Sequence, residues 1–216
     1  MPSLETLLTF IPVALALNLT PGADMLFCLG QGARSGPLAG ITAALGIALG
    51  GMGHALAAGL GLAALIAASP AAFEALRWAG VAYLSWLGIK ALRAPAPDPQ
   101  AATRTGHAPF RPLHTLREAL GVSLLNPKVA AFMLALVPQF IVPADGPVWS
   151  QFLAFGAVIG CGGVLVNGTV GAMAGRISAA LARRRGAGGG RAMQRLSGGV
   201  FLALAATLAF TRRAGA

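Results

Sequence analysis

The sequence predicts an all-α integral membrane protein with six transmembrane helices, arranged as two inverted three-helix repeats in which helices 1 and 4 are broken. Of the 216 residues, 56% are hydrophobic and only 10% are charged, and the mean hydropathy is +0.73. Soluble domains carry about 25% charged residues, so this composition excludes a soluble globule. The apolar content is also too high for a disordered chain.

Three predicted spans lie in the first half of the chain, because a membrane-crossing helix needs about 20 predominantly apolar residues. The first apolar run covers residues 6–23 and resumes beyond Asp24. It is expected to be retained rather than cleaved as a signal peptide, because Glu5 is the only charged residue before it. The second span falls within residues 37–72, and the third covers residues 71–92.

Three further spans are predicted in the second half. The fourth covers residues 119–142, and the fifth, residues 146–175, carries no charge. The sixth, residues 196–210, is shorter and lies between Arg195 and Arg212. The long side chains of these arginines can reach the two membrane interfaces.

The loops between the spans differ in charge. Residues 94–112, rich in proline and arginine, form a linker that divides a single membrane domain into halves at 1–93 and 113–216. This linker and the loops at 30–36 and 176–195 carry most of the arginines. The positive-inside rule places these basic loops in the cytoplasm and both termini outside.

The net charge of +10 could indicate nucleic-acid binding. However, the basic residues cluster beside apolar spans, and they are not interleaved with aromatic residues that could stack on bases. The topology rule accounts for this excess. The lipid bilayer, and no nucleic acid, is therefore the expected partner.

Two proline-containing segments are expected to break the first and fourth spans. The first contains Asn18, Thr20, Pro21, Gly22 and Asp24, and the second is Asn126, Pro127 and Lys128. Proline cannot extend the hydrogen-bond ladder of a helix, and glycine relaxes the backbone. In hydrocarbon the freed polar groups must be satisfied by protein, water or a ligand. The alternative is an ordinary proline kink in each span, with Asp24 paired to an arginine at the interface.

The two segments lie at matching depths. Asn18 follows the start of its apolar run, Thr6, by 12 residues, and Asn126 follows the expected helix start, Thr115, by 11 residues. At about 1.5 Å per residue, both lie about 16 to 18 Å from the membrane face where their span begins. Three spans per half reverse the orientation of the second half. Inverted repeats with broken helices at mid-membrane are typical of secondary transporters.

Other polar residues within the spans have simpler explanations. His54 could relay protons, or it could hydrogen-bond a neighbouring helix. Asn167 and Gln139 are expected to form hydrogen bonds between helices. Cys28 and Cys161 are expected to pack as small apolar residues. Glycines spaced three or four residues apart in the second and fifth spans indicate close helix packing.

The order and spacing of these segments resemble the LysE/RhtB family of bacterial amino-acid exporters over nearly the whole chain. The similar segments are residues 18–24, 31–36, 126–128, 138–140 and 195–198, together with Gly80, Tyr83, Leu84 and Gly88. The resemblance implies export of amino acids or close derivatives across the bacterial inner (plasma) membrane, driven by protons and without an organic cofactor. The family usually has a second proline where this chain has Ala23, so the first break is expected to be gentler.

The working hypothesis is alternating access around a mid-membrane site. The opened backbone at Asn18, Thr20, Pro21 and Gly22 and at Asn126 and Pro127 would bind the zwitterionic substrate, since helix ends attract charged groups. Lys128 would pair with the carboxylate of the substrate. Asp24 would bind its ammonium or the exchanging proton, and His54 is the second candidate for proton coupling.

Several alternatives remain open from the sequence. A membrane thiol-electron carrier would use both cysteines, but Cys28 and Cys161 do not occupy equivalent spans. A metal-ion exporter would need several carboxylates, and Asp24 is the only one deep in a span. A passive channel is a further alternative. The sequence shows no arrangement of a nucleophile, a base and an orienting residue, so no enzyme is expected. The Gly-rich helix faces are compatible with a homodimer.

Overall fold

The computed structural model describes residues 1–68, 70–93 and 109–174, and also residues 195, 199, 202, 203, 205, 206, 209 and 210. Within these residues the secondary structure is entirely helical. The α-helices are α1 (Leu4–Leu19), α2 (Ala23–Ser35), α3 (Pro37–Ala68), α4 (Pro70–Arg93), α5 (Pro112–Leu124), α6 (Pro127–Ala135) and α7 (Val148–Ala172). Two short 3-10 helices, η1 (Val137–Phe140) and η2 (Pro143–Asp145), precede α7.

Both predicted helix breaks are present. The pair α1 and α2 bends by 58° at the Thr20–Gly22 break, and the pair α5 with α6 and η1 bends by 53° at the second break. The first break was expected to be gentler because Ala23 replaces a proline. Its bend is as large as that of the second break, so Pro21 and Gly22 are sufficient to interrupt the helix; a gentler bend than that of the family stays a prediction.

The described residues contain two to four candidate membrane spans. Residues Pro37–Gly61 of α3 and Val148–Ala172 of α7 are long and apolar enough to cross a bilayer, and each bent pair adds one more if it counts as a single span. The third predicted span coincides with α4, a helix of 24 residues. The basic loop 176–195 and the sixth span, 196–210, lie mostly outside the described residues, as does the linker up to residue 108.

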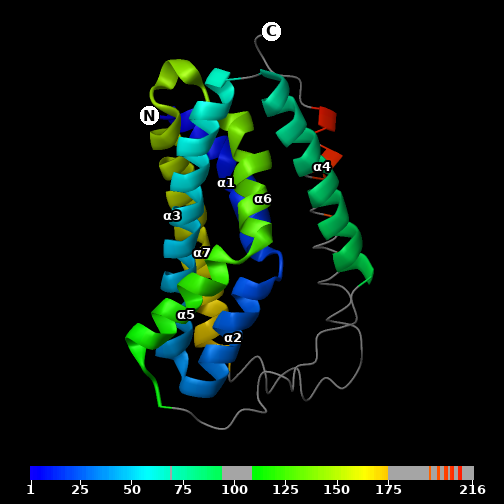
Figure 1. Ribbon diagram of the computed structural model, residues 1–216. Coiled ribbons are helices and arrows are strands. Elements are labelled where there is room, and N and C mark those ends of the chain that lie inside the picture. Colours follow the sequence, from blue (N-terminus) through cyan, green and yellow to red (C-terminus); the bar gives the residue numbers. More distant parts are fainter. Residues whose placement is uncertain are drawn as a thin grey trace.

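The two broken pairs run in opposite directions (Figure 1). Figure 1 shows α1 and α6 at the end of the bundle that holds the N-terminus, while α2 and α5 lie at the other end and α3 and α7 extend along both. The amino group of Met1 donates a hydrogen bond to the carbonyl of Asp145 in η2, so the N-terminus and this loop share one end. We call it the N-terminal end. The helix α4 packs against α6.

An aromatic cluster fills the N-terminal end of the bundle. Phe10 of α1 lies 6.3 Å from Phe132 of α6, 5.0 Å from Phe140 of η1 and 4.7 Å from Phe155 of α7, measured between ring centroids. Phe10, Phe132 and Phe155 are fully buried. These four rings pack α1, α6, η1 and α7 together and close this end of the bundle.

Glycines bring α2, α3 and α7 into backbone contact at the opposite end. A Cβ atom added to Gly171 of α7 would lie 2.7 Å from the Cα atom of Gly40 in α3. One added to Gly32 of α2 would lie 1.8 Å from the carbonyl oxygen of Gly171. Only glycine permits this separation, which confirms the close packing predicted for the second and fifth spans. We call this contact the glycine seam.

Gly171→Ala is expected to destabilise the protein by about 1 to 3 kcal/mol, because the new methyl group must push apart rigid backbone rather than a flexible side chain. Gly168→Ala is the matched control, one helical turn away on α7. Its Cβ atom would meet only the Cβ atom of Ala44, at 3.7 Å, so the change should be neutral or slightly stabilising. Thermal unfolding of both purified variants in detergent measures the difference. Equal unfolding midpoints for the two variants would contradict the close backbone contact at the glycine seam.

Candidate functional site

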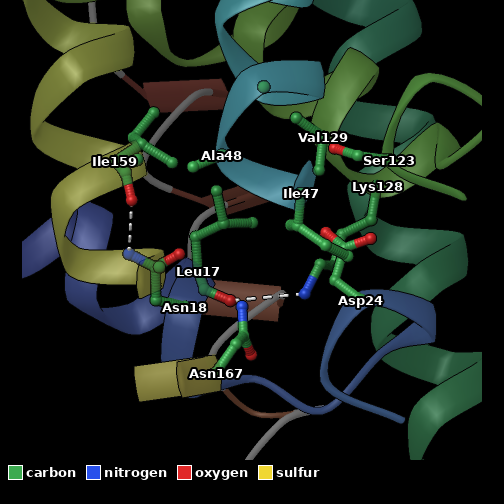
Figure 2. A pocket seen from close by; sticks show the side chains of 13 residues that line it. Leu17, Asn18, Asp24, Ile47, Ala48, Ser123, Lys128, Val129, Ile159 and Asn167 are labelled. Atoms are coloured by element: carbon green, nitrogen blue, oxygen red, sulfur yellow. Dashed lines mark hydrogen bonds between the residues drawn. The ribbon is translucent and has the colours of Figure 1, made fainter. Parts of the chain in front are cut away.

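Lys128 connects the two helix breaks. Asn126 caps α6, and its side-chain oxygen accepts a hydrogen bond from the backbone N–H of Lys128 at 3.0 Å. The Lys128 side chain crosses to the end of α1, where Nζ donates to the carbonyl of Thr20 at 3.0 Å. It also donates to the carbonyl of Leu17 at 3.4 Å (Figure 2). The last carbonyls of a helix lack partners within it, and a cation is favourable at that end. An ammonium group from the second break therefore satisfies the first.

The residues of the first break make room for this contact. A Cβ atom on Gly22 would lie 3.1 Å from Nζ of Lys128, so glycine leaves space for the ammonium group. The hydroxyl of Thr20 donates to the carbonyl of Ala16 at 2.6 Å. Thr20 and Gly22 thus position Lys128 through their backbone rather than through side chains that face a ligand.

A cavity of about 30 Å³ lies between the two breaks. Its polar wall comes from both halves of the chain: Asn18, Asp24, Ser123, Lys128 and Asn167 (Figure 2). The remaining wall is apolar side chains and glycines from α1, α3, α6 and α7. A water molecule needs only about 10 to 15 Å³ of such space, whereas an amino acid needs several times more. In this conformation the cavity is therefore too small for an amino acid.

Asp24 is the carboxylate of the cavity. It lies in the first turn of α2 and is only 6% exposed. Its position at a helix N-terminus favours the negative charge. Asn126, Lys128 and His54 are all close enough to act on it electrostatically, yet its Oδ1 atom has no hydrogen-bond partner. Asp24 therefore retains an unused acceptor among polar groups from both halves.

Asn18 and His54 link helices near the cavity. The amide of Asn18 donates to the carbonyl of Ile159 in α7 at 3.0 Å. The Nε2 atom of His54 in α3 lies 3.1 Å from the carbonyl oxygen of Ser123 in α5, to which its N–H donates. This is the interhelical hydrogen bond considered as the alternative to a proton relay. A proton-coupling role for His54 stays a prediction.

The structure separates the predicted site residues into two groups. Asn18, Asp24 and Lys128 line the cavity. The others form the breaks or lie behind the cavity wall: Thr20, Pro21, Gly22, Asn126, Pro127 and His54.

The sequence did not point to two polar residues of the cavity wall, Ser123 and Asn167. Ser123 lies three residues before Asn126, and a single serine in an apolar run gave no signal beyond its closeness to the second break. Asn167 was expected to bond between helices, but its Oδ1 atom has no partner although the residue is buried.

The two cysteines lie on different helices. Cys28 on α2 is buried and Cys161 on α7 is exposed, and both thiols are free. Across the described ranges no three His, Cys, Asp or Glu side chains are grouped closely enough to hold a metal ion.

Replacing Lys128 by Met should destabilise the protein by about 1 to 3 kcal/mol, because the carbonyls of Leu17 and Thr20 would lose their donor inside an apolar bundle. Lys90→Met on α4 is the control, since Lys90 is exposed and lies over the ring of Trp86 at 4.7 Å. Unfolding of both variants in the same detergent measures the difference. A loss no larger for Lys128→Met than for Lys90→Met would show that the break does not need the lysine.

Comparisons with known proteins agree with a translocator. The model of the LysE type translocator family matches residues 15–212. An uncharacterised membrane protein of Vibrio cholerae is 37% identical over 149 residues, which are 69% of this chain and 71% of that protein. A homoserine/homoserine lactone efflux protein of Salmonella typhi is 33% identical over 214 residues, 92% of this chain and 93% of the relative. A leucine efflux protein of Enterobacter sp. (strain 638) is 33% identical over 145 residues, 67% and 68% of the two chains.

The search of solved structures gave no match. The family match extends over both helix breaks and most of the chain, and one relative aligns over nearly the full length. The chain belongs to the LysE type translocator family.

Proposed function

We propose that the protein is a secondary transporter that exports amino acids or close derivatives from the bacterial cytoplasm across the inner membrane. Its family and the efflux relatives support this class of function. The observation that carries the proposal is the cavity between two helix breaks, with a carboxylate and an ammonium group in its wall. An amino acid carries the same two charges, so this wall is complementary to a zwitterion.

The two charged groups of the substrate would bind at different helix ends of the breaks. The ammonium of the substrate would bind the unused Oδ1 atom of Asp24, near the C-terminal end of α1, where a cation is favourable. Its carboxylate would bind Lys128 near the N-terminal end of α6. An ammonium group has three N–H donors, and those of Lys128 already reach the carbonyls of Leu17 and Thr20. One donor is left for the substrate.

Competition at Asp24 would couple export to protons. A protonated Asp24 is neutral and cannot attract the ammonium of the substrate, while a bound ammonium disfavours protonation. The two ligands then oppose each other's binding, and this linkage is reciprocal. His54 is a second candidate for this coupling because it lies within electrostatic reach of Asp24.

Alternating access would open the cavity to one side at a time. The cavity is too small for an amino acid, and the aromatic cluster and the glycine seam pack its two ends. Substrate therefore enters only if one end separates. Two inverted three-helix repeats, at 1–93 and 113–216, would supply two related ends for this motion. With the basic loops in the cytoplasm, the aromatic cluster is the periplasmic closure and the seam is the cytoplasmic one.

An efflux panel tests the proposed function. Expression in an exporter-deficient bacterial host loaded with dipeptides should raise the external concentration of at least one amino acid above the internal concentration. An external amino-acid concentration that exceeds the internal one separates a secondary transporter from a passive channel. Cells that carry the empty vector are the control. Equal efflux from both strains for every amino acid would refute export.

Asp24→Asn should abolish the effect of an imposed pH gradient on exchange in proteoliposomes, because the amide cannot exchange a proton. Substrate binding should be weaker than in the wild type, because the negative charge is lost, but should remain measurable through Lys128. Asp145→Asn, in the loop of η2, is the matched control and should keep the wild-type response. Labelled substrate flux is measured with and without the gradient. Unchanged proton coupling in Asp24→Asn would reject Asp24 as the proton site.

A further inference from the structure

Two polar side chains of the cavity wall take no part in the mechanism proposed above. Ser123 is 0% exposed and Asn167 is 5% exposed. The Oγ atom of Ser123 and the Oδ1 atom of Asn167 have no hydrogen-bond partner. A buried polar group without a partner costs about 1 to 3 kcal/mol, and such groups are uncommon in folded proteins. Their presence together in one cavity calls for a physical reason.

Ser123 is held firmly in this position. A Cβ atom on Gly50 of α3 would lie 2.6 Å from the Cβ atom of Ser123 and 2.9 Å from its Oγ atom. Glycine at position 50 therefore lets α5 approach α3 closely. The carbonyl of Ser123 accepts the backbone N–H of Asn126 at 3.0 Å and the ring N–H of His54 at 3.1 Å. These contacts fix the backbone, and the hydroxyl remains free in the cavity wall.

Asn167 lies on the opposite helix of the cavity, α7. Its amide nitrogen would be 3.9 Å from a Cβ atom on Gly163, a glycine that also borders the amide of Asn18. The Asn18 amide is already committed to the carbonyl of Ile159, whereas Asn167 keeps a free carbonyl oxygen. Its side-chain amide can present either its oxygen or its NH₂ group to a ligand by rotation.

We propose that Ser123 and Asn167 are specificity-determining residues that hydrogen-bond a polar side chain of the substrate. This assignment rests on the proposed function, in which Asp24, Lys128 and the helix ends bind the charged head group. The two uncommitted polar groups then face the remaining part of the substrate. An aliphatic side chain would leave them unpaired, and a site of this kind discriminates strongly against such a substrate. The protein therefore selects small amino acids with a hydroxyl or amide over aliphatic ones of equal size.

Pairs of substrates that differ only by hydroxyl and methyl groups test this proposal. Labelled threonine with valine, and homoserine with norvaline, are compared in proteoliposomes that contain the full chain. Wild-type protein should transport the hydroxyl member of at least one pair faster. Ser123→Ala and Asn167→Leu should each lower this ratio roughly tenfold, because one hydrogen bond to the substrate is lost. Transport of the methyl member should be unchanged or faster.

Thr169→Val is the matched control. Thr169 lies on α7 near Asn167, is exposed, and donates its hydroxyl to the carbonyl of Leu165 at 2.6 Å. Its substitution should leave the substrate ratio at the wild-type value. Asn167→Ser replaces Asn167→Leu if the latter fails to give a monodisperse protein, and it should also lower the ratio.

The outcomes separate this inference from the proposed function. Wild-type protein that moves neither member of any pair, and no amino acid in the efflux panel, would overturn the proposed function. Wild-type protein that transports amino acids without favouring the hydroxyl member would overturn the specificity assignment alone. The same conclusion would follow from folded Ser123 and Asn167 variants that keep the wild-type ratio.

Discussion

The hydrogen bonds from Lys128 to the carbonyls of Leu17 and Thr20 are the interaction on which the rest of the structure depends. A helix broken inside an apolar bundle leaves carbonyl groups that have no water to bond to. Here the donor comes from the other break, where Asn126 caps the helix that carries Lys128. The first break is satisfied by the second, so the two halves must meet at this point. The cavity lies where they meet.

The helices pack closely through apolar contacts at both ends of the bundle, on either side of this polar centre. The rings around Phe10 fill one end, and backbone contact between Gly40 and Gly171 fills the other. In lipid, such packing rather than the hydrophobic effect holds helices together. Contacts between small or flat surfaces can separate without exposing unpaired polar groups. A transporter that opens its ends in turn needs this property at its ends and firm polar contacts at its centre.

The sequence predicted the breaks well because proline and glycine act on the backbone locally, and Asp24 and Lys128 stood out because charge is rare at membrane depth. It could not predict that Lys128 would reach the carbonyls of α1, because that contact depends on how α1 and α6 pack. Nor could it predict that the side chain of Asn126 caps α6, while the role of Asn126 in substrate binding stays a prediction. Ser123 carried no signal, since serines are common in packed membrane helices and its free hydroxyl depends on its neighbours in space.

Proton release on substrate binding is the most direct test of a cavity in which substrate and proton share Asp24. Purified protein in weakly buffered detergent solution is titrated with a transported amino acid while the pH is recorded. Competition for the carboxylate predicts that binding releases protons from wild-type protein and releases none from Asp24→Asn. Binding to wild-type protein without proton release, or equal release from both proteins, would contradict it.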